Sequence, residues 1–213
     1  YPEHAQRKFE EHMHAARDVH MKNPDMYKHI ERHGGDGGRA YPGSCGECLS
    51  LAEWQLDDPS VNLLDLLAQA ATIESDSRVN VNDDVFLSPG DMPAKIQGNC
   101  SRAGMTVPKT KPEIVRCILD SLADAYAEAI RGLEEITSTK IDQLNVVGGG
   151  SQNTLLAQLT ADAAGIKVVT GPVEATALGN LVCQAGVFGA APADLAGQRS
   201  LIASQFKVSS FLP

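Results

Sequence analysis

The sequence lacks both a long apolar run and an excess of basic charge. None of its apolar stretches approaches the roughly 18 consecutive residues that a membrane-spanning helix requires. The formal net charge is -9 at pH 7, and a negative field repels the phosphate groups of nucleic acids and of anionic lipids. We therefore expect neither a nucleic acid nor a membrane as a partner.

Cysteine is also scarce. Five cysteines make an odd, sparse set, unlike the dense and even framework of a small secreted domain held by disulfides. Residues 1–11 are polar and do not resemble the apolar core of a signal peptide. These features predict mostly reduced thiols and a cytoplasmic location. The cysteines are Cys45, Cys48, Cys100, Cys117 and Cys183.

Histidine is absent after position 33, although six histidines precede that point, and a glycine-rich stretch follows at 34–46. Such a change in composition predicts a boundary, which we place near residue 45. Residues 1–45 then form a His-rich helical arm with a Gly-rich linker, and 46–213 form a second region. A weak apolar stripe supports the arm's helix. It consists of Phe9, Met13, Ala16 and His20.

The histidines and the Cys45-Gly46-Glu47-Cys48 segment suggest a structural zinc site, because imidazole and paired thiolates are zinc ligands. The spacing is unfavourable, since no His pair follows the cysteines at the usual distance. His29 and His33 could share a helix face, but two ligands make a weak site. A solvated helical arm, a zinc site and a redox role for the two cysteines therefore all stay open.

After the boundary the pattern predicts short helices at 49–54 and 63–71, and a turn-rich loop or arm over 78–93. A long helix should start at Pro112, where the missing N–H costs nothing, with Glu113 placed favourably for the helix dipole. Apolar residues at spacings of three and four predict a broad buried stripe on this helix. They are Ile114, Ile118, Leu122, Tyr126, Ala129, Ile130 and Leu133.

From Ile141 onward the pattern changes to strand, glycines, helix, strand and helix. Two strands separated by a helix of this length predict a right-handed parallel crossover, and hence an α/β layer. The expected elements are a strand at 144–147, a helix from an N-cap at Ser151 to Ala164 closed by Gly165, a strand at 166–169, and a helix at 173–187 interrupted by Gly179.

The consecutive glycines Gly148, Gly149 and Gly150 lie between a predicted strand and a helix N-terminus. A ligand can approach such a backbone closely, and the amide groups and dipole of the next helix favour phosphate oxygens. The sequence lacks the Gly-Lys-Ser/Thr of a P-loop and the third glycine of a dinucleotide fingerprint. The glycines predict a nucleotide-binding turn, with a purely structural turn as the alternative.

A longer stretch resembles the C-terminal lobe of the FGGY carbohydrate kinases, and within them the rhamnulokinase subgroup. The likeness is carried by residues 146–156, 161–163 and 171–180, and it extends over about residues 47–190. The resemblance implies an actin-like ATPase (ribonuclease H-like) C-terminal lobe, in which helices flank a mixed sheet. It also implies ATP and Mg²⁺ as cofactors.

By this resemblance Gly148, Gly149 and Gly150 lie against the phosphates and ribose, and Gln152 and Asn153 reach toward the adenosine. For Asn153 the alternative is an ordinary polar residue in the first turn of a helix. Residues 174–180 resemble the family's second helix behind the nucleotide, and we expect them mainly to pack.

The family transfers the γ-phosphoryl group of ATP to a hydroxyl of a ketose, and an aspartate of the N-terminal lobe accepts the hydroxyl proton. Only residues 1–45 precede the similar stretch, and they do not resemble that lobe. We identify no catalytic residue, because Asp83 and Asp84 lie in a turn-rich arm and Asp162 on a solvent-facing helix position.

The resemblance therefore implies the ATP-binding lobe of a kinase that converts L-rhamnulose to L-rhamnulose 1-phosphate, and we expect this lobe to be inactive unless a complementing lobe is present. Either residues 1–45 or a second chain, from a homo-oligomer or a partner, should cover the exposed side of its sheet. Two alternatives stay open. One is a non-catalytic nucleotide-binding or partner-docking module, and the other is a zinc-binding protein organised by the N-terminal histidines.

Overall fold

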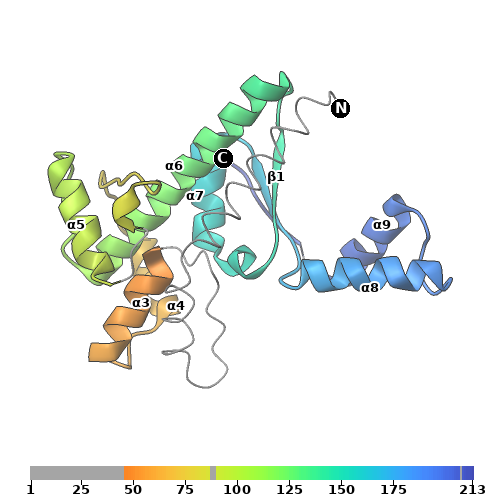
Figure 1. The fold of residues 1–213 in the computed structure, drawn as a ribbon, viewed down its shortest axis with the longest axis horizontal. Coiled ribbons are helices and arrows are strands. Elements are labelled where there is room, and N and C mark those ends of the chain that lie inside the picture. Colours follow the sequence, from red (N-terminus) through yellow and green to blue (C-terminus); the bar gives the residue numbers. More distant parts are fainter. Residues whose placement is uncertain (1–45, 87–89, 207) are drawn as a thin grey trace. The chain divides into compact units, whose positions relative to one another are not determined.

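The computed structural model describes residues 46–86, 90–206 and 208–213 (Figure 1). The chain divides into two units, Tyr1–Ser44 and Cys45–Pro213, and the described residues all belong to the second. The predicted His-rich arm, its histidines and Cys45 lie outside the described residues, as does the side chain of Cys48.

The first part of the described unit is helical. It comprises α3 (Gly46–Asp57), α4 (Leu63–Ala70), the short 3-10 helix η1 (Asp84–Phe86), α5 (Met92–Arg102) and α6 (Lys111–Thr137). The helices predicted near 49–54, at 63–71 and from Pro112 are confirmed. Helix α5 was not predicted, and it begins at Met92, inside the loop or arm expected over 78–93; its Pro93 lies in the first helical turn, where proline is tolerated.

The long helix α6 begins with a reciprocal capping box. The hydroxyl of Thr110 accepts a hydrogen bond from the Glu113 N–H at 3.3 Å, and the Glu113 carboxylate accepts one from the Thr110 N–H at 2.8 Å. The Glu113 carboxylate also accepts a hydrogen bond from the Lys109 N–H at 2.7 Å. The bonds that the carboxylate accepts from the Thr110 and Lys109 N–H groups hold the pKa of Glu113 below its usual value. The sequence signal for the start of this helix is therefore explained by local contacts alone.

The buried stripe of α6 differs in part from the predicted one. Ile114, Ile118 and Ile130 are buried, but Tyr126 and Leu133 keep 43% and 52% of their surface exposed. Helices α3, α4, α5 and α7 all contact α6, and its first half is buried on several sides. In its second half the buried residues are Ala127 and Ile130. The additional buried positions are Val115, Cys117, Leu119, Asp120, Ser121, Ala123 and Ala127.

A charged group is buried within this helical packing. The Asp120 carboxylate is 4% exposed and lies 2.9 Å from Arg116 Nε and 3.2 Å from Arg78 Nη1. Arg116 also donates to the Ala70 carbonyl at the end of α4, and Arg78 donates to the carbonyls of Ser75 and Ser77. Asp120 thus ties the end of α4 and the segment after it to α6.

A small mixed sheet follows the helices. Its strands are β1 (Gln143–Val146), β2 (Lys167–Thr170) and β3 (Ser209–Phe211), in the order β1-β2-β3. Strands β1 and β2 are parallel and are connected through α7 (Thr154–Ala164), as predicted, whereas β3 joins β2 antiparallel. The three-residue β3 was not predicted from the sequence, because it is too short to show an alternating pattern.

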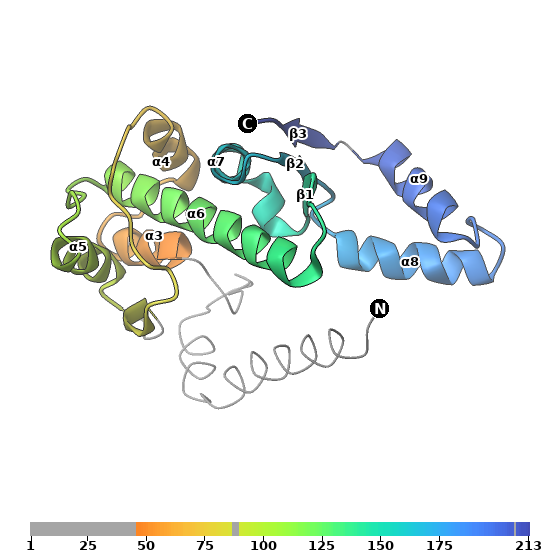
Figure 2. The ribbon, with the colours of Figure 1, turned by 90° about the horizontal axis from the view of Figure 1, so that it is seen from above.

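Helix α7 lies between the helices and the sheet (Figure 2). Its residues Leu155, Leu156 and Leu159 pack against the core formed by α3 to α6. Its residues Ala157 and Ala161 form a second, smaller core with β2. One helix therefore connects the two parts of the unit.

The last helices are α8 (Ala175–Val187) and α9 (Leu195–Gln205), which lie side by side in both views (Figures 1 and 2). The predicted interruption at Gly179 is wrong, since α8 runs through it. No residue of either helix is buried. Among the described residues, no helix is long and apolar enough to cross a membrane.

The buried carboxylate gives a stability prediction. Replacing Asp120→Asn removes the charge that two arginines share, and it should lower the free energy of unfolding by about 3 kcal/mol. Urea unfolding followed by circular dichroism measures this change. The control is Asp124→Asn, because Asp124 also binds Arg78 but its side chain is 56% exposed, so its loss should cost less than about 1 kcal/mol. Equal losses in the two variants would contradict the role assigned to Asp120.

The cysteines give a reactivity prediction. Cys100 and Cys117 are buried with their sulfur atoms 3.8 Å apart. Burial raises the pKa of Cys117 to about 12 and raises that of Cys100 as well. At pH 8, iodoacetamide should therefore modify the exposed Cys183 and spare these two until urea is added. Peptide mass spectrometry measures the modification, and rapid labelling of Cys117 in the folded protein would contradict its burial.

Candidate functional site

The glycine turn begins where β1 ends. Gly148 has φ 84°, in the left-handed region that favours glycine. Its carbonyl accepts hydrogen bonds from the Ser151 N–H at 3.1 Å and from the Ser151 hydroxyl at 2.6 Å. Residues Gly149–Gln152 form the 3-10 helix η2. The buried Ser151 therefore closes the turn from inside.

The prediction that Ser151 caps the following helix is wrong. Helix α7 begins at Thr154, and Asn153 is its N-cap, with its side-chain oxygen accepting from the Leu156 N–H at 3.0 Å. Ser151 cannot be the N-cap because it lies within the 3-10 helix η2, which occupies residues 149–152, and α7 starts only after η2 ends. At the other end, Gly165 closes the helix with φ 66°, as predicted.

The cap restricts what Asn153 can offer a ligand. Its oxygen is engaged with the helix backbone, while its amide nitrogen is a separate donor. The two interpretations of Asn153, helix cap and adenosine contact, are therefore compatible. The oxygen would serve the helix and the nitrogen the ligand.

The segment joining β2 to α8 packs directly against the turn. The Gly171 N–H donates to the Val146 carbonyl at 2.7 Å, and the Gly148 N–H donates to the Pro172 carbonyl at 3.2 Å. A Cβ atom on Gly171 would lie 3.0 Å from the Val147 side chain, so a larger residue there would crowd it. Gly171 and Pro172 were expected only to end the second strand, which stops at Thr170, and their contact with the turn was not predicted because it depends on the folded chain.

The outer side of the turn is open. Gly149 and Gly150 are exposed, and a Cβ atom on either would meet nothing within 4 Å. Gln152 is exposed next to them. The open backbone of Gly149 and Gly150 is thus accessible to a bulky anionic group, at the end of the turn that leads into α7. The five predicted nucleotide contacts are neighbours because they lie within residues 148–153 of the sequence, and their contact with a nucleotide stays a prediction.

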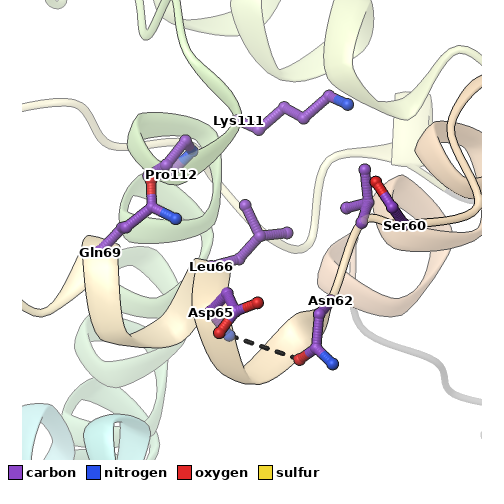
Figure 3. A pocket seen from close by; sticks show the side chains of 8 residues that line it. Ser60, Asn62, Asp65, Leu66, Gln69, Lys111 and Pro112 are labelled. Atoms are coloured by element: carbon purple, nitrogen blue, oxygen red, sulfur yellow. Dashed lines mark hydrogen bonds between the residues drawn. The ribbon is translucent and has the colours of Figure 1, made fainter.

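Two hollows on the unit lie away from this turn. One, of about 350 Å³, lies at the N-terminal ends of α4 and α6, with Leu66 at its centre and Asp65 and Lys111 at its edge (Figure 3). The other, of about 320 Å³, lies between residues 79–82 and α6. Neither is lined by a residue of the glycine turn. The turn is therefore an open surface and not the floor of either hollow.

Two of the three carboxylates considered as catalytic bases, Asp83 and Asp162, have structural partners. Asp83 accepts hydrogen bonds from the Asn99 side chain at 3.0 Å and from the Val85 N–H at 2.9 Å. Asp162 accepts one from the Gln158 side chain on the exposed face of α7. Asp84 begins η1. Within the described part of the chain, no group of three or more His, Cys, Asp or Glu side chains could hold a metal ion.

Relatives with assigned names match much of this chain. A rhamnulokinase of Bacteroides thetaiotaomicron is 40% identical over 170 residues, which are 79% of this chain and 35% of that protein. Rhamnulokinases of Pectobacterium carotovorum and Pectobacterium atrosepticum are each 43% identical, over 146 and 137 residues, or 29% and 27% of their own lengths. The chain therefore spans roughly a third of the length of the curated relatives it matches.

A family model also matches the chain. Its description is the C-terminal domain of the FGGY family of carbohydrate kinases, and it covers residues 29–186, beginning ahead of the boundary expected near residue 45. The mixed sheet with flanking helices fits the actin-like ATPase fold implied by the resemblance. The matched range includes the glycine turn and nearly all of α8. The chain belongs to the FGGY family of carbohydrate kinases, and it matches the C-terminal domain of that family.

Proposed function

We propose that this chain is the ATP-binding part of a rhamnulokinase-like enzyme, whose reaction would be the ATP-dependent phosphorylation of L-rhamnulose to L-rhamnulose 1-phosphate. The observation that carries the proposal is the open backbone of Gly149 and Gly150 between β1 and α7. Such a turn suits phosphate oxygens, since neither glycine presents a side chain toward the ligand. The names of the matched relatives support the choice of sugar.

In this proposal Gly148, Gly149 and Gly150 lie along the phosphates and ribose. Gln152 and the amide nitrogen of Asn153 reach toward the adenosine. Magnesium would arrive with the nucleotide, because kinases bind Mg²⁺ largely through substrate phosphates and water and need no dedicated cage of protein ligands. The cation would neutralise charge that develops on the transferred phosphoryl group.

The chain would need further polypeptide for turnover. A kinase of this kind requires a carboxylate that accepts the proton of the sugar hydroxyl, and we assign that carboxylate to a lobe outside this chain. We propose accordingly that the 213-residue chain alone does not phosphorylate a sugar. A cytoplasmic location belongs to the same proposal, since the sparse cysteines suit a reducing compartment.

Two other functions stay open. A non-catalytic nucleotide-binding or docking module would also use the open turn, and it would bind ATP without sugar-dependent turnover in any complex. A zinc-binding role would depend on the histidines of residues 1–33 and on Cys45 and Cys48. Zinc-dependent folding with indifference to ATP would favour that role.

A substitution in the turn tests nucleotide binding. Gly149→Val places a branched side chain where the phosphates should lie, and its Cβ atom would meet no protein atom within 4 Å. We expect titration calorimetry of the metal-free chain with Mg²⁺ and ATP to show affinity weakened at least about tenfold in the variant. The control is Gly165→Ala, which forces alanine to φ 66° and should cost about 1 kcal/mol of stability while ATP affinity is kept.

The ATP affinities of the unmodified chain and the two variants show whether the glycine turn still binds nucleotide. Binding that is lost in Gly149→Val and kept in Gly165→Ala supports a working nucleotide turn. Absence of binding in the unmodified chain and in both variants, at millimolar ATP, would contradict the proposal that this chain holds ATP by itself.

A matched pair at Asn153 separates its two roles. Asn153→Asp keeps an oxygen for the Leu156 N–H and should leave the free energy of unfolding within about 0.5 kcal/mol of the parent. The same change removes the amide donor and adds a negative charge, so ATP affinity should fall about tenfold. Asn153→Ala should lose about 1 kcal/mol of stability as well. Urea unfolding and calorimetry measure the two quantities, and unchanged ATP affinity in Asn153→Asp would leave Asn153 as a helix cap only.

A further inference from the structure

The connection from β2 to α8 contains one extra residue where it passes the glycine turn. The paired residues of β1 and β2 end at Val146 and Thr170. The next bond, from the Gly171 N–H to the Val146 carbonyl at 2.7 Å, keeps that register. In a continued parallel ladder the Gly148 N–H would then meet the Gly171 carbonyl, but it meets the Pro172 carbonyl at 3.2 Å. The connection therefore bulges by one residue beside the turn.

The glycine in this bulge is required by space. The φ angle of Gly171 lies outside the left-handed region, so an alanine could adopt its backbone conformation. A Cβ atom there would lie 3.0 Å from Val147 Cγ1, well inside the roughly 3.5 Å at which two carbon atoms pack. Valine is restricted at χ1, so we expect an added methyl to displace the Val147 backbone. Val147 directly precedes Gly148, and the displacement would therefore reach the turn.

Gly148 has both of its backbone polar groups engaged inside the protein. Its N–H donates to the Pro172 carbonyl, and its own carbonyl accepts from the N–H and the hydroxyl of Ser151. The N–H groups that follow are free for a ligand. Within the described part of the chain, no hydrogen bond involves the N–H of Gly149 or of Gly150, and both residues are exposed. The position of Gly148 therefore sets where these two N–H groups point.

We propose that Gly171 is a positioning residue of the nucleotide-binding turn. It contacts no ligand itself. The space that it leaves beside Val147 lets the Pro172 carbonyl hold Gly148, and Gly148 in turn fixes the direction of the two free N–H groups. This role rests on the proposed function and adds to the same site a residue from the connection between β2 and α8. A glycine that only ended a strand would affect stability and leave ATP affinity unchanged.

The variant Gly171→Ala tests this role with a single added methyl group. We expect titration calorimetry with Mg²⁺ and ATP to show binding about fivefold weaker than in the unmodified chain. Val147→Ala removes the atom that the methyl would meet. The double variant Val147→Ala, Gly171→Ala should therefore bind ATP within about twofold of Val147→Ala alone.

The matched control is Gly98→Ala, which adds the same methyl on the exposed side of α5. A Cβ atom at Gly98 would meet nothing within 4 Å. This variant should bind ATP within about twofold of the unmodified chain. A fivefold loss in this control would mean that an added methyl weakens binding wherever it lies, and would overturn the role assigned to Gly171.

The exchange rate of the Gly148 amide gives a second readout that needs no nucleotide. Its bond to the Pro172 carbonyl should protect it. We expect exchange at least about tenfold faster in Gly171→Ala than in the unmodified chain, and a return to the slower rate in the double variant. The thermal midpoint of Gly171→Ala should stay within about 3 °C of the unmodified chain. If Gly171→Ala does not fold, the double variant must fold and bind ATP for the role to stand.

The positioning role and the nucleotide site can fail separately. Unchanged ATP affinity in Gly171→Ala, in a chain that binds ATP, overturns the positioning role alone. A loss of affinity that Val147→Ala does not restore overturns it too, because the contact between the two side chains is then not the cause. In a chain that does not bind ATP, faster Gly148 exchange that the double variant reverses upholds the hold of Gly171 on the turn, while the nucleotide proposal fails.

Discussion

The helical half of the unit depends on one buried carboxylate. Asp120 lies inside α6, where an unpaired negative charge would be strongly unfavourable, and it is tolerated because Arg78 and Arg116 both reach it. Arg116 also donates to the Ala70 carbonyl at the end of α4. Arg78 also donates to the Ser77 carbonyl in the loop that follows α4. One charge therefore fixes the position of α4 and of that loop against α6.

Helix α7 connects the helical half of the unit to the sheet. The leucines of α7 pack on the helical core, and its Ala157 and Ala161 pack on β2. Because β1 leads into α7 through the glycine turn, the position of Gly149 and Gly150 depends on the packing of two sides of that helix, one on the helical core and one on β2. The turn is thus a rigid feature on its inner side, closed by Ser151, while its outer side faces open space.

The glycine turn is an open part of the described unit. Gly149 and Gly150 are exposed, and a Cβ atom on either would meet nothing within 4 Å. Neither described hollow is lined by a residue of the turn. Under the proposed function the turn would present its backbone to the phosphates, and the catalytic carboxylate would belong to polypeptide outside this chain.

The sequence by itself determined the features whose causes are local. The capping box of Thr110 and Glu113, the helix end at Gly165, and the order of strand, glycines, helix and strand all depend on residues a few positions apart. Only the tertiary structure decided which side of α6 is buried and that Gly171 packs against the turn. These outcomes depend on which distant elements arrive beside a residue, and periodicity and capping preferences carry no information about those neighbours.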